Sequence, residues 1–295
     1  MSIVLTLVLL SVGLYALALV RGLRRDARQG GGHAAAPAPV SAAPADGAVS
    51  VRPDPVLGAA LVTHALTLLW PMSDDVFHFG FAYLLSATVW IGLFLVWVES
   101  RRVTMGRLPL LLAPLAMLLV TLPQFFPGAA FRLDQQAPLF VPHLVVGTLA
   151  YGMVFMAALQ ALLMAAAEHR LHPRRQDRAG VLTTLLARGH QALPPLMVLE
   201  RILFQVIRVA FVLLLLTTVS GAVFGEEIFG RALPLNHKTV FSLVATVFFG
   251  LLLLGRRLWG WRGRLAIRLT LGGFILLLLS YVGSRFVLEV ILQRI

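Results

Sequence analysis

Two histidines, His143 and His237, each stand at the start of a long apolar run, directly after a connection that contains proline. The chain has no cysteine, so thiolates cannot hold a metal or a haem group. Neutral imidazole is then the usual side chain that binds haem iron or another borderline metal. Arg285, near the end of the last apolar run, is placed to anchor an anionic group such as a haem propionate. These residue types predict a haem site if both histidines reach the same membrane face.

Each of these residues also has a simpler interpretation. Interfacial histidines commonly cap a helix or hydrogen-bond locally. Arg285 precedes Glu289 by four residues, a spacing at which two opposite charges pair on one helix. His64 and His78 are further candidates, but His64 lies in an otherwise apolar run, where a packed and hydrogen-bonded core histidine is expected. No catalytic serine, carboxylate pair or phosphate loop is recognisable, so we do not expect an enzyme.

A polar stretch, residues 217–243, separates two strongly apolar runs and contains the only lysine of the chain, Lys238. Polar groups beside a membrane core cost several kcal/mol unless they are solvated or paired. The stretch is therefore a second candidate site. Its carboxylates Glu226 and Glu227, together with His237 and Lys238, would suit a divalent ion or a docking partner.

The composition is that of a membrane protein. The 295 residues are 59% hydrophobic and 13% charged, and the mean hydropathy is +0.87. These values exclude a water-soluble domain and indicate a polytopic helical protein. The net charge of +12 comes from short arginine clusters between apolar runs. Because such clusters are what membrane orientation produces, we expect no nucleic-acid partner.

Eight apolar runs are long enough, or nearly so, to span a bilayer. They cover residues 3–20, 55–70, 77–98, 108–122, 143–166, 203–224, 240–254 and 265–288. The sequence therefore predicts an all-α bundle of about eight transmembrane helices. Its domains would be a first helix at 1–20, a linker at 21–54 that is rich in glycine, alanine and proline, and a seven-helix membrane domain at 55–295.

The arginines predict the orientation. Nineteen of the 25 lysines and arginines fall in the connections after the first, third, fifth and seventh runs, and five fall in the alternate set. Arg208 lies inside the sixth run. Because positive residues are retained on the cytoplasmic side, the first set is expected there and both termini outside. His143 and His237 would then share the outer face.

Several pieces of the second half recur in order in a known family. They are His143 with LVVGTLAYGMVFMAALQALLMA, then LERILFQ, VSGAVFGEEIFG, HKTVFSL and GWRGRLAIRLTLGGFILLLLSYVGSRFVLE. In these pieces the chain resembles the cytochrome c assembly superfamily, which includes CcsA, CcmC and HemX-like proteins, and is most similar to its YpjD-type inner-membrane subgroup. The resemblance covers residues 140–292.

The resemblance implies a multi-pass protein of the bacterial inner membrane that binds or handles haem as an assembly accessory factor. Its partners would be haem, the lipid bilayer and another membrane or periplasmic protein. His143 matches the first ligating histidine of the family. The family's haem platform is rich in tryptophan, but residues 223–239 contain none and no histidine follows the last run. His237 is our own assignment as second ligand. HemX-like relatives also suggest an alternative, a regulatory or ion-transport accessory protein without haem.

Overall fold

Eight α-helices make up most of the chain that the computed structural model describes, namely residues 3–30, 54–73, 76–101, 108–132, 140–171, 195–229, 237–283 and 286. They are α1 (Ile3–Gly30), α2 (Pro55–Leu69), α3 (Phe81–Glu99), α4 (Leu108–Thr121), α5 (Phe140–Leu171), α7 (Leu196–Phe229), α8 (His237–Trp259) and α9 (Gly263–Leu278). A π-helical turn, Leu279–Gly283, continues α9. Every predicted apolar run contains one helix, so the all-α fold class is confirmed.

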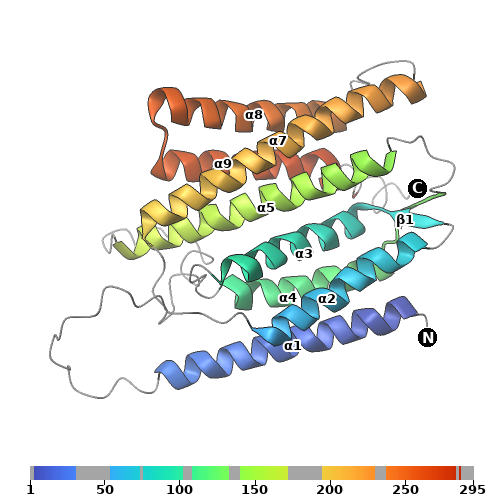
Figure 1. The fold of residues 1–295 in the computed structure, drawn as a ribbon, viewed down its shortest axis with the longest axis vertical. Helices are drawn as coiled ribbons and strands as arrows, with labels where there is room; N and C mark the ends of the chain where they lie inside the picture. The colour runs from blue at the N-terminus through green and yellow to red at the C-terminus, as the bar shows by residue number, and fades with distance from the viewer. Residues whose placement is uncertain are drawn as a thin grey trace.

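The helices are arranged as two groups of four. In the first group α1 packs on α2, α2 on α3, α3 on α4 and α4 on α1. In the second group α5 packs on α7, α7 on α8, α8 on α9 and α9 on α5. Each group is therefore a closed ring of four helices, and the two lie side by side in Figure 1. The first helix is thus an integral part of the first ring.

Helices α3 and α5 join the two rings through glycines. A Cβ atom built on Gly92 of α3 would lie 2.5 Å from the Phe155 ring, and one built on Gly152 of α5 would lie 2.5 Å from the Ile91 side chain. Small residues of this kind let helix backbones approach closely, which is how helices associate when lipid provides no hydrophobic driving force. The α3–α5 contact therefore depends on having no side chain at these two positions.

Six of the described helices are long and apolar enough to cross a membrane: α1, α2, α3, α5, α7 and α8. The fourth predicted span is a shorter apolar helix, Leu108–Gln124. Four helices, α1, α5, α7 and α8, exceed their predicted lengths. Helix α5 extends from Phe140 to Leu171 and α7 from Leu196 to Phe229. The polar stretch at 217–243 is thus largely helical. Its polar residues up to Phe229 continue α7 beyond the apolar run, and only 230–236 lie outside the described residues.

The third predicted span was wrong at its start. Phe77–Phe79 form a short strand, β1, which pairs antiparallel with β2 (Ala129–Phe131), and α3 begins only at Phe81. Phe77 and Phe79 are buried while His78 points outward, as alternation along a strand requires. Gly128 has φ of 82°, and a Cβ atom there would lie 2.5 Å from the Gly80 Cα, so the turn needs glycine.

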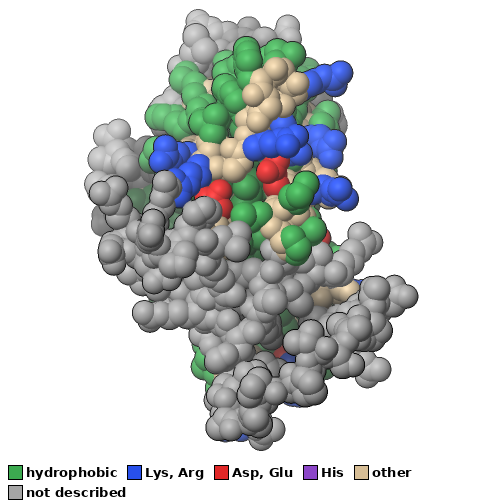
Figure 2. Space-filling view, turned by 90° about the vertical axis from the view of Figure 1, so that its left-hand side faces the viewer, with side chains coloured by type: hydrophobic (Ala, Val, Ile, Leu, Met, Phe, Trp, Pro, Cys, Tyr) green, Lys and Arg blue, Asp and Glu red, His purple; other side chains and the backbone are tan. Residues whose placement is uncertain are grey.

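Consecutive helices run in opposite directions, so each end of the molecule collects alternate helix termini (Figure 1). The starts of α1, α3, α5 and α8 lie at the end that carries β1, and the starts of α2, α4, α7 and α9 lie at the opposite end. Figure 2 shows this opposite end, where arginines gather around acidic side chains. The described arginines are concentrated there, as the predicted alternation of positive connections requires.

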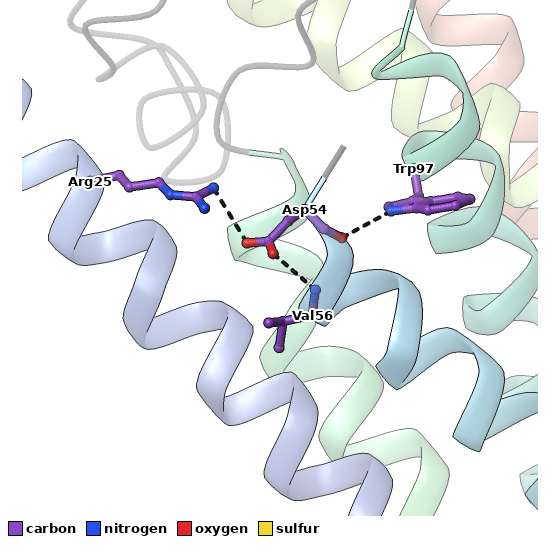
Figure 3. Close-up of polar contacts among 4 residues, drawn as sticks. All are labelled: Arg25, Asp54, Val56 and Trp97. Atoms are coloured by element: carbon purple, nitrogen blue, oxygen red, sulfur yellow. Dashed lines mark hydrogen bonds and ion pairs between the residues drawn. The ribbon is translucent and has the colours of Figure 1, made fainter. Parts of the chain in front are cut away.

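The start of the predicted linker is helical. Helix α1 continues ten residues past Val20. This extension contains arginines, which have a high helix propensity and are exposed to water at the helix end. Arg25 on this extension lies 3.4 Å from Asp54, whose other carboxylate oxygen accepts a hydrogen bond from the Val56 N–H and caps α2 (Figure 3). The Trp97 indole of α3 donates to the Asp54 carbonyl. Asp54 thus connects three helices. Residues 31–53 lie outside the described residues.

Candidate haem-ligand site

His143 lies in the first turns of α5 and contacts α7. Its Nδ1 atom is 2.9 Å from the Ser220 hydroxyl, and the side chain is half-buried. Pro142 precedes it in the first turn of the helix, where the missing proline N–H leaves no hydrogen bond unmade. A Cβ atom on Gly221 would come within 3.1 Å of the His143 Cε1 atom. The glycine therefore leaves room for the imidazole between the two helices.

The hydrogen bonds of Ser220 favour one tautomer of His143. The Ser220 hydroxyl has the Thr217 carbonyl as an acceptor at 3.2 Å. When it donates there, its oxygen accepts from the His143 Nδ1–H, and the lone pair of the imidazole is on Nε2. Metal-binding histidines are oriented in this way, with one ring nitrogen donating to a neighbouring oxygen and the other facing the metal.

The side of α5 that carries His143 also contacts α9 further along the helix. His143, Gly147 and Tyr151 are spaced by four residues and share one side of the helix. A Cβ atom on Gly147 would lie 3.4 Å from Thr217 of α7, while the Tyr151 hydroxyl donates to the Leu277 carbonyl of α9 at 2.9 Å. The π-helical turn Leu279–Gly283 begins just beyond that carbonyl. Such turns in α-helices are frequent at functional sites.

The elements that bear or precede the three predicted site residues have ends at one end of the second ring. His143 is near the start of α5, His237 is the first residue of α8, and Arg285 follows the π-helical turn that ends α9. The starts of α5 and α8 share the end that carries β1. The His237 side chain and the whole of Arg285 lie outside what the structure describes, as do the side chains of Glu226 and Glu227.

The ring order places α5 and α8 on opposite sides of the second ring. Helix α8 packs on α7 and α9, and so does α5. The two histidine-bearing helices therefore face each other across the ring. Cofactor sites in four-helix bundles are built in this way, from side chains of facing helices that project inward.

His64 is confirmed as a core histidine. It is fully buried, with its Nδ1 atom 3.0 Å from the Tyr15 hydroxyl and its Nε2 atom 2.9 Å from the Ser86 hydroxyl. These partners come from α1 and α3, while His64 belongs to α2. Both ring nitrogens are therefore used to join three helices of the first ring.

An aromatic layer near His143 was not predicted from the sequence. Phe77 and Phe79 of β1 pack with Leu144 of α5 and with Val282 of the π-helical turn. Phe131 of β2 lies against Phe140, with ring centroids 5.6 Å apart. In the sequence, the only indication of this layer was the presence of phenylalanines before two separate helices. In the structure, they pack beside Leu144, which follows His143.

Within the described part of the chain, no group of three or more histidines and carboxylates is placed to hold a metal ion. A ligand set made only of described protein side chains is therefore not present.

Comparison with known proteins identifies the family. A family model described as "Cytochrome C assembly protein" matches residues 56–292, which is most of the chain. The chain belongs to the cytochrome c assembly protein family. The match begins at α2 and therefore includes most of the first ring, well before residue 140, where the sequence resemblance was placed.

Relatives in this family differ in how much of the chain they match. The inner membrane protein YpjD of Escherichia coli K12 is 30% identical over 194 residues, 66% of this chain and 68% of YpjD. A 28.8 kDa protein of Azospirillum brasilense is 32% identical over 176 residues, 56% of this chain and 61% of that protein. The cytochrome c biogenesis protein CcsA of Prochlorococcus marinus MIT 9215 is 32% identical over 88 residues, 30% of this chain and 28% of CcsA. No solved structure gives a significant match.

Proposed function

We propose that this member of the cytochrome c assembly protein family binds haem at the β1 end of its second helix ring and acts as an accessory factor without enzymatic activity. His143 and His237 would be the axial ligands, and Arg285 would pair with a propionate. The observation that carries the proposal is His143 itself, a half-buried imidazole at the mouth of a four-helix ring whose Nδ1 proton is directed to Ser220.

The residues around His143 fit such a group. The Nε2 lone pair is the form that coordinates iron, and Gly147 and Gly221 keep the α5–α7 contact free of bulky side chains near the imidazole. The aromatic layer of β1 and β2 beside Leu144 supplies an apolar boundary. When bound, haem would supply the redox and carrier chemistry. The protein side chains would hold it, orient it and limit the access of water.

The proposal includes an orientation. The described arginines cluster at the end of the molecule opposite to β1 (Figure 2), and positive residues are retained on the cytoplasmic side of membranes. The His143 end would then face the periplasm of a bacterial inner membrane. The inner-membrane location of the relative YpjD is consistent with this placement.

Haem titration of the purified chain in detergent tests the site. We expect a Soret band that saturates with the wild type, weakens in His143→Ala and in His237→Ala, and is lost in the double variant. His78→Ala is the matched control, because His78 is an exposed histidine of β1 at the same end. Absence of haem binding by the wild type, or unchanged binding by the double variant, would reject the proposal.

The rival hypothesis is a non-haem regulatory or ion-transport accessory protein that uses Glu226, Glu227, His237 and Lys238. Glu226 and Glu227 both belong to the last turns of α7, which extends to Phe229. A deletion strain separates the hypotheses. A haem factor predicts loss of c-type cytochromes, whereas an ion factor predicts altered metal content with cytochromes intact.

A further inference from the structure

The arginine-rich end of the second ring carries more positive charge than its own carboxylates can neutralise. We call this surface the arginine patch, and it consists of Arg201, Arg208, Arg256, Arg257, Arg262, Arg264 and Arg268. Only two described carboxylates face it. Glu200 lies 3.8 Å from Arg256 and 3.7 Å from Arg262, and Glu168 lies 3.3 Å from Arg264. Among the described residues, these two carboxylates pair with three of the seven guanidinium groups.

The patch is bordered by apolar side chains. Figure 2 shows arginines around acidic side chains, with hydrophobic side chains next to them. Trp259 is 64% exposed and stacks on Trp261, with ring centroids 5.6 Å apart. Exposed tryptophan beside arginine is typical of the level at which lipid headgroups lie. The patch is therefore expected to lie where the headgroups of one leaflet meet the protein.

Two arginines of the patch, Arg256 of α8 and Arg208 of α7, lie near the same phenylalanine, Phe204. The Arg256 guanidinium lies 3.6 Å from the centroid of the Phe204 ring, and its Nη1 atom is buried with no hydrogen-bond partner among the described residues. Arg208 is one turn beyond Phe204 on α7 and close enough for its charge to act on Arg256. Glu200 lies one turn before Phe204 and pairs with Arg256 at 3.8 Å. Arg256 therefore lies between one carboxylate and a second guanidinium of α7.

Arg208 also belongs to the lipid-facing side of α7. It is exposed on the same side of the helix as Val212 and Val219, which are about half exposed. It lies twelve residues after Leu196, about 18 Å along the helix axis at 1.5 Å per residue. Arg208 therefore lies within the candidate membrane span Leu196–Val223. A guanidinium in a membrane span is stabilised by an anion that is itself in the membrane.

We infer that Arg208 and Arg256 bind the phosphate of an anionic phospholipid, with its acyl chains along Val212 and Val219. A phosphodiester oxygen accepts charge-assisted hydrogen bonds from guanidinium, and its attached chains keep it at this depth. The excess of positive charge favours a lipid with a net negative headgroup over a zwitterionic one. The inference is independent of haem, since the patch lies at the end of the ring opposite to His143.

Lipid titration of delipidated protein in detergent, followed by native mass spectrometry and thermal unfolding, tests the inference. We expect phosphatidylglycerol to bind and to raise the unfolding temperature, and phosphatidylcholine to bind at least tenfold more weakly. Arg208→Gln should weaken phosphatidylglycerol binding about tenfold, because it removes one charge-assisted contact. Arg208→Lys should lose less, since it keeps the charge.

Arg21→Gln is the matched control. Arg21 is an exposed arginine near the same end of the molecule, on α1 outside the patch, and its loss should leave lipid binding unchanged. Equal binding of the two lipids, or an Arg208→Gln variant that binds like the wild type, would overturn the inference. Competition by inorganic phosphate at the concentration of the lipid would instead show a site for soluble anions and would also overturn it.

Discussion

At the scale of single residues, His143 and His64 show how the same side chain is given two different tasks. Both are neutral imidazoles with a hydroxyl partner on Nδ1. In His64 the Nε2 atom is also bonded, to Ser86, and the ring is fully buried. In His143 the Nδ1 atom lies 2.9 Å from the Ser220 hydroxyl, and the side chain is only half-buried. Burial, and not residue type, separates the core histidine from the candidate ligand.

Ser220→Ala should disturb His143 without removing it. The variant loses the acceptor for the Nδ1 proton, and loss of such an orienting partner typically weakens ligation 10- to 100-fold. Nitrogen NMR of labelled histidine in the haem-free protein should show a single Nδ1–H tautomer for His143 that becomes mixed in the variant. Thr148→Ala is the control, because that hydroxyl bonds the Leu144 carbonyl of its own helix. An unchanged His143 spectrum in Ser220→Ala would contradict the assignment.

Tyr15→Phe tests the core role of His64. The variant leaves the buried Nδ1 atom without its partner at 3.0 Å, and an unsatisfied buried polar group costs about 1–3 kcal/mol. We expect the free energy of unfolding in detergent to fall by that amount, while haem titration stays as in the wild type. An unfolding midpoint equal to that of the wild type would show that the hydrogen bond contributes nothing.

At the scale of elements, the α3–α5 contact determines how the two rings sit together. Gly152→Ala places a methyl group about 2.5 Å from Ile91, a β-branched side chain with little freedom to move. Overpacking of this kind costs about 1–3 kcal/mol, so we expect a lower unfolding temperature. Adding Ile91→Ala should recover part of the loss, because the double variant relieves the clash.

Gly13→Ala is the control for this element. A Cβ atom at Gly13 of α1 would meet nothing within 4 Å, and alanine favours helix over glycine by about 1 kcal/mol. Its unfolding temperature should therefore stay equal or rise. If Gly152→Ala behaved like Gly13→Ala, the rings would not depend on the glycine contact.

At the scale of the whole molecule, helix direction and charge together predict which end faces which side of the membrane. The chain has no cysteine, so single cysteines can be introduced without background. Phe125, which is 74% exposed, follows α4 at the β1 end, and Arg257 is exposed at the arginine end. We expect an impermeant maleimide to label Phe125→Cys in cells whose outer membrane has been made permeable, and Arg257→Cys only after lysis. The opposite pattern would reverse the proposed orientation and place His143 at the cytoplasmic face.

The sequence alone was sufficient for the features that depend on local composition. Long apolar runs must become helices in a bilayer, because every backbone N–H and C=O group has to be satisfied within the segment. This requirement is why all eight predicted runs contain a helix. The helix start at the proline before His143 and the charged ends at the arginine clusters could likewise be predicted, since these residues act within one turn of their own position.

Other features depend on segments that are distant in the sequence, and only the tertiary structure decided them. Phe77–Phe79 are as apolar as a helix start, yet they form a strand because Ala129–Phe131 provides a partner. Ser220 gains its role only when α7 lies against α5, 77 residues from His143. The closure of α5, α7, α8 and α9 into a ring places the two histidine-bearing helices across from each other. No local pattern encodes such contacts, because their energy comes from packing between segments and not from the propensity of either one.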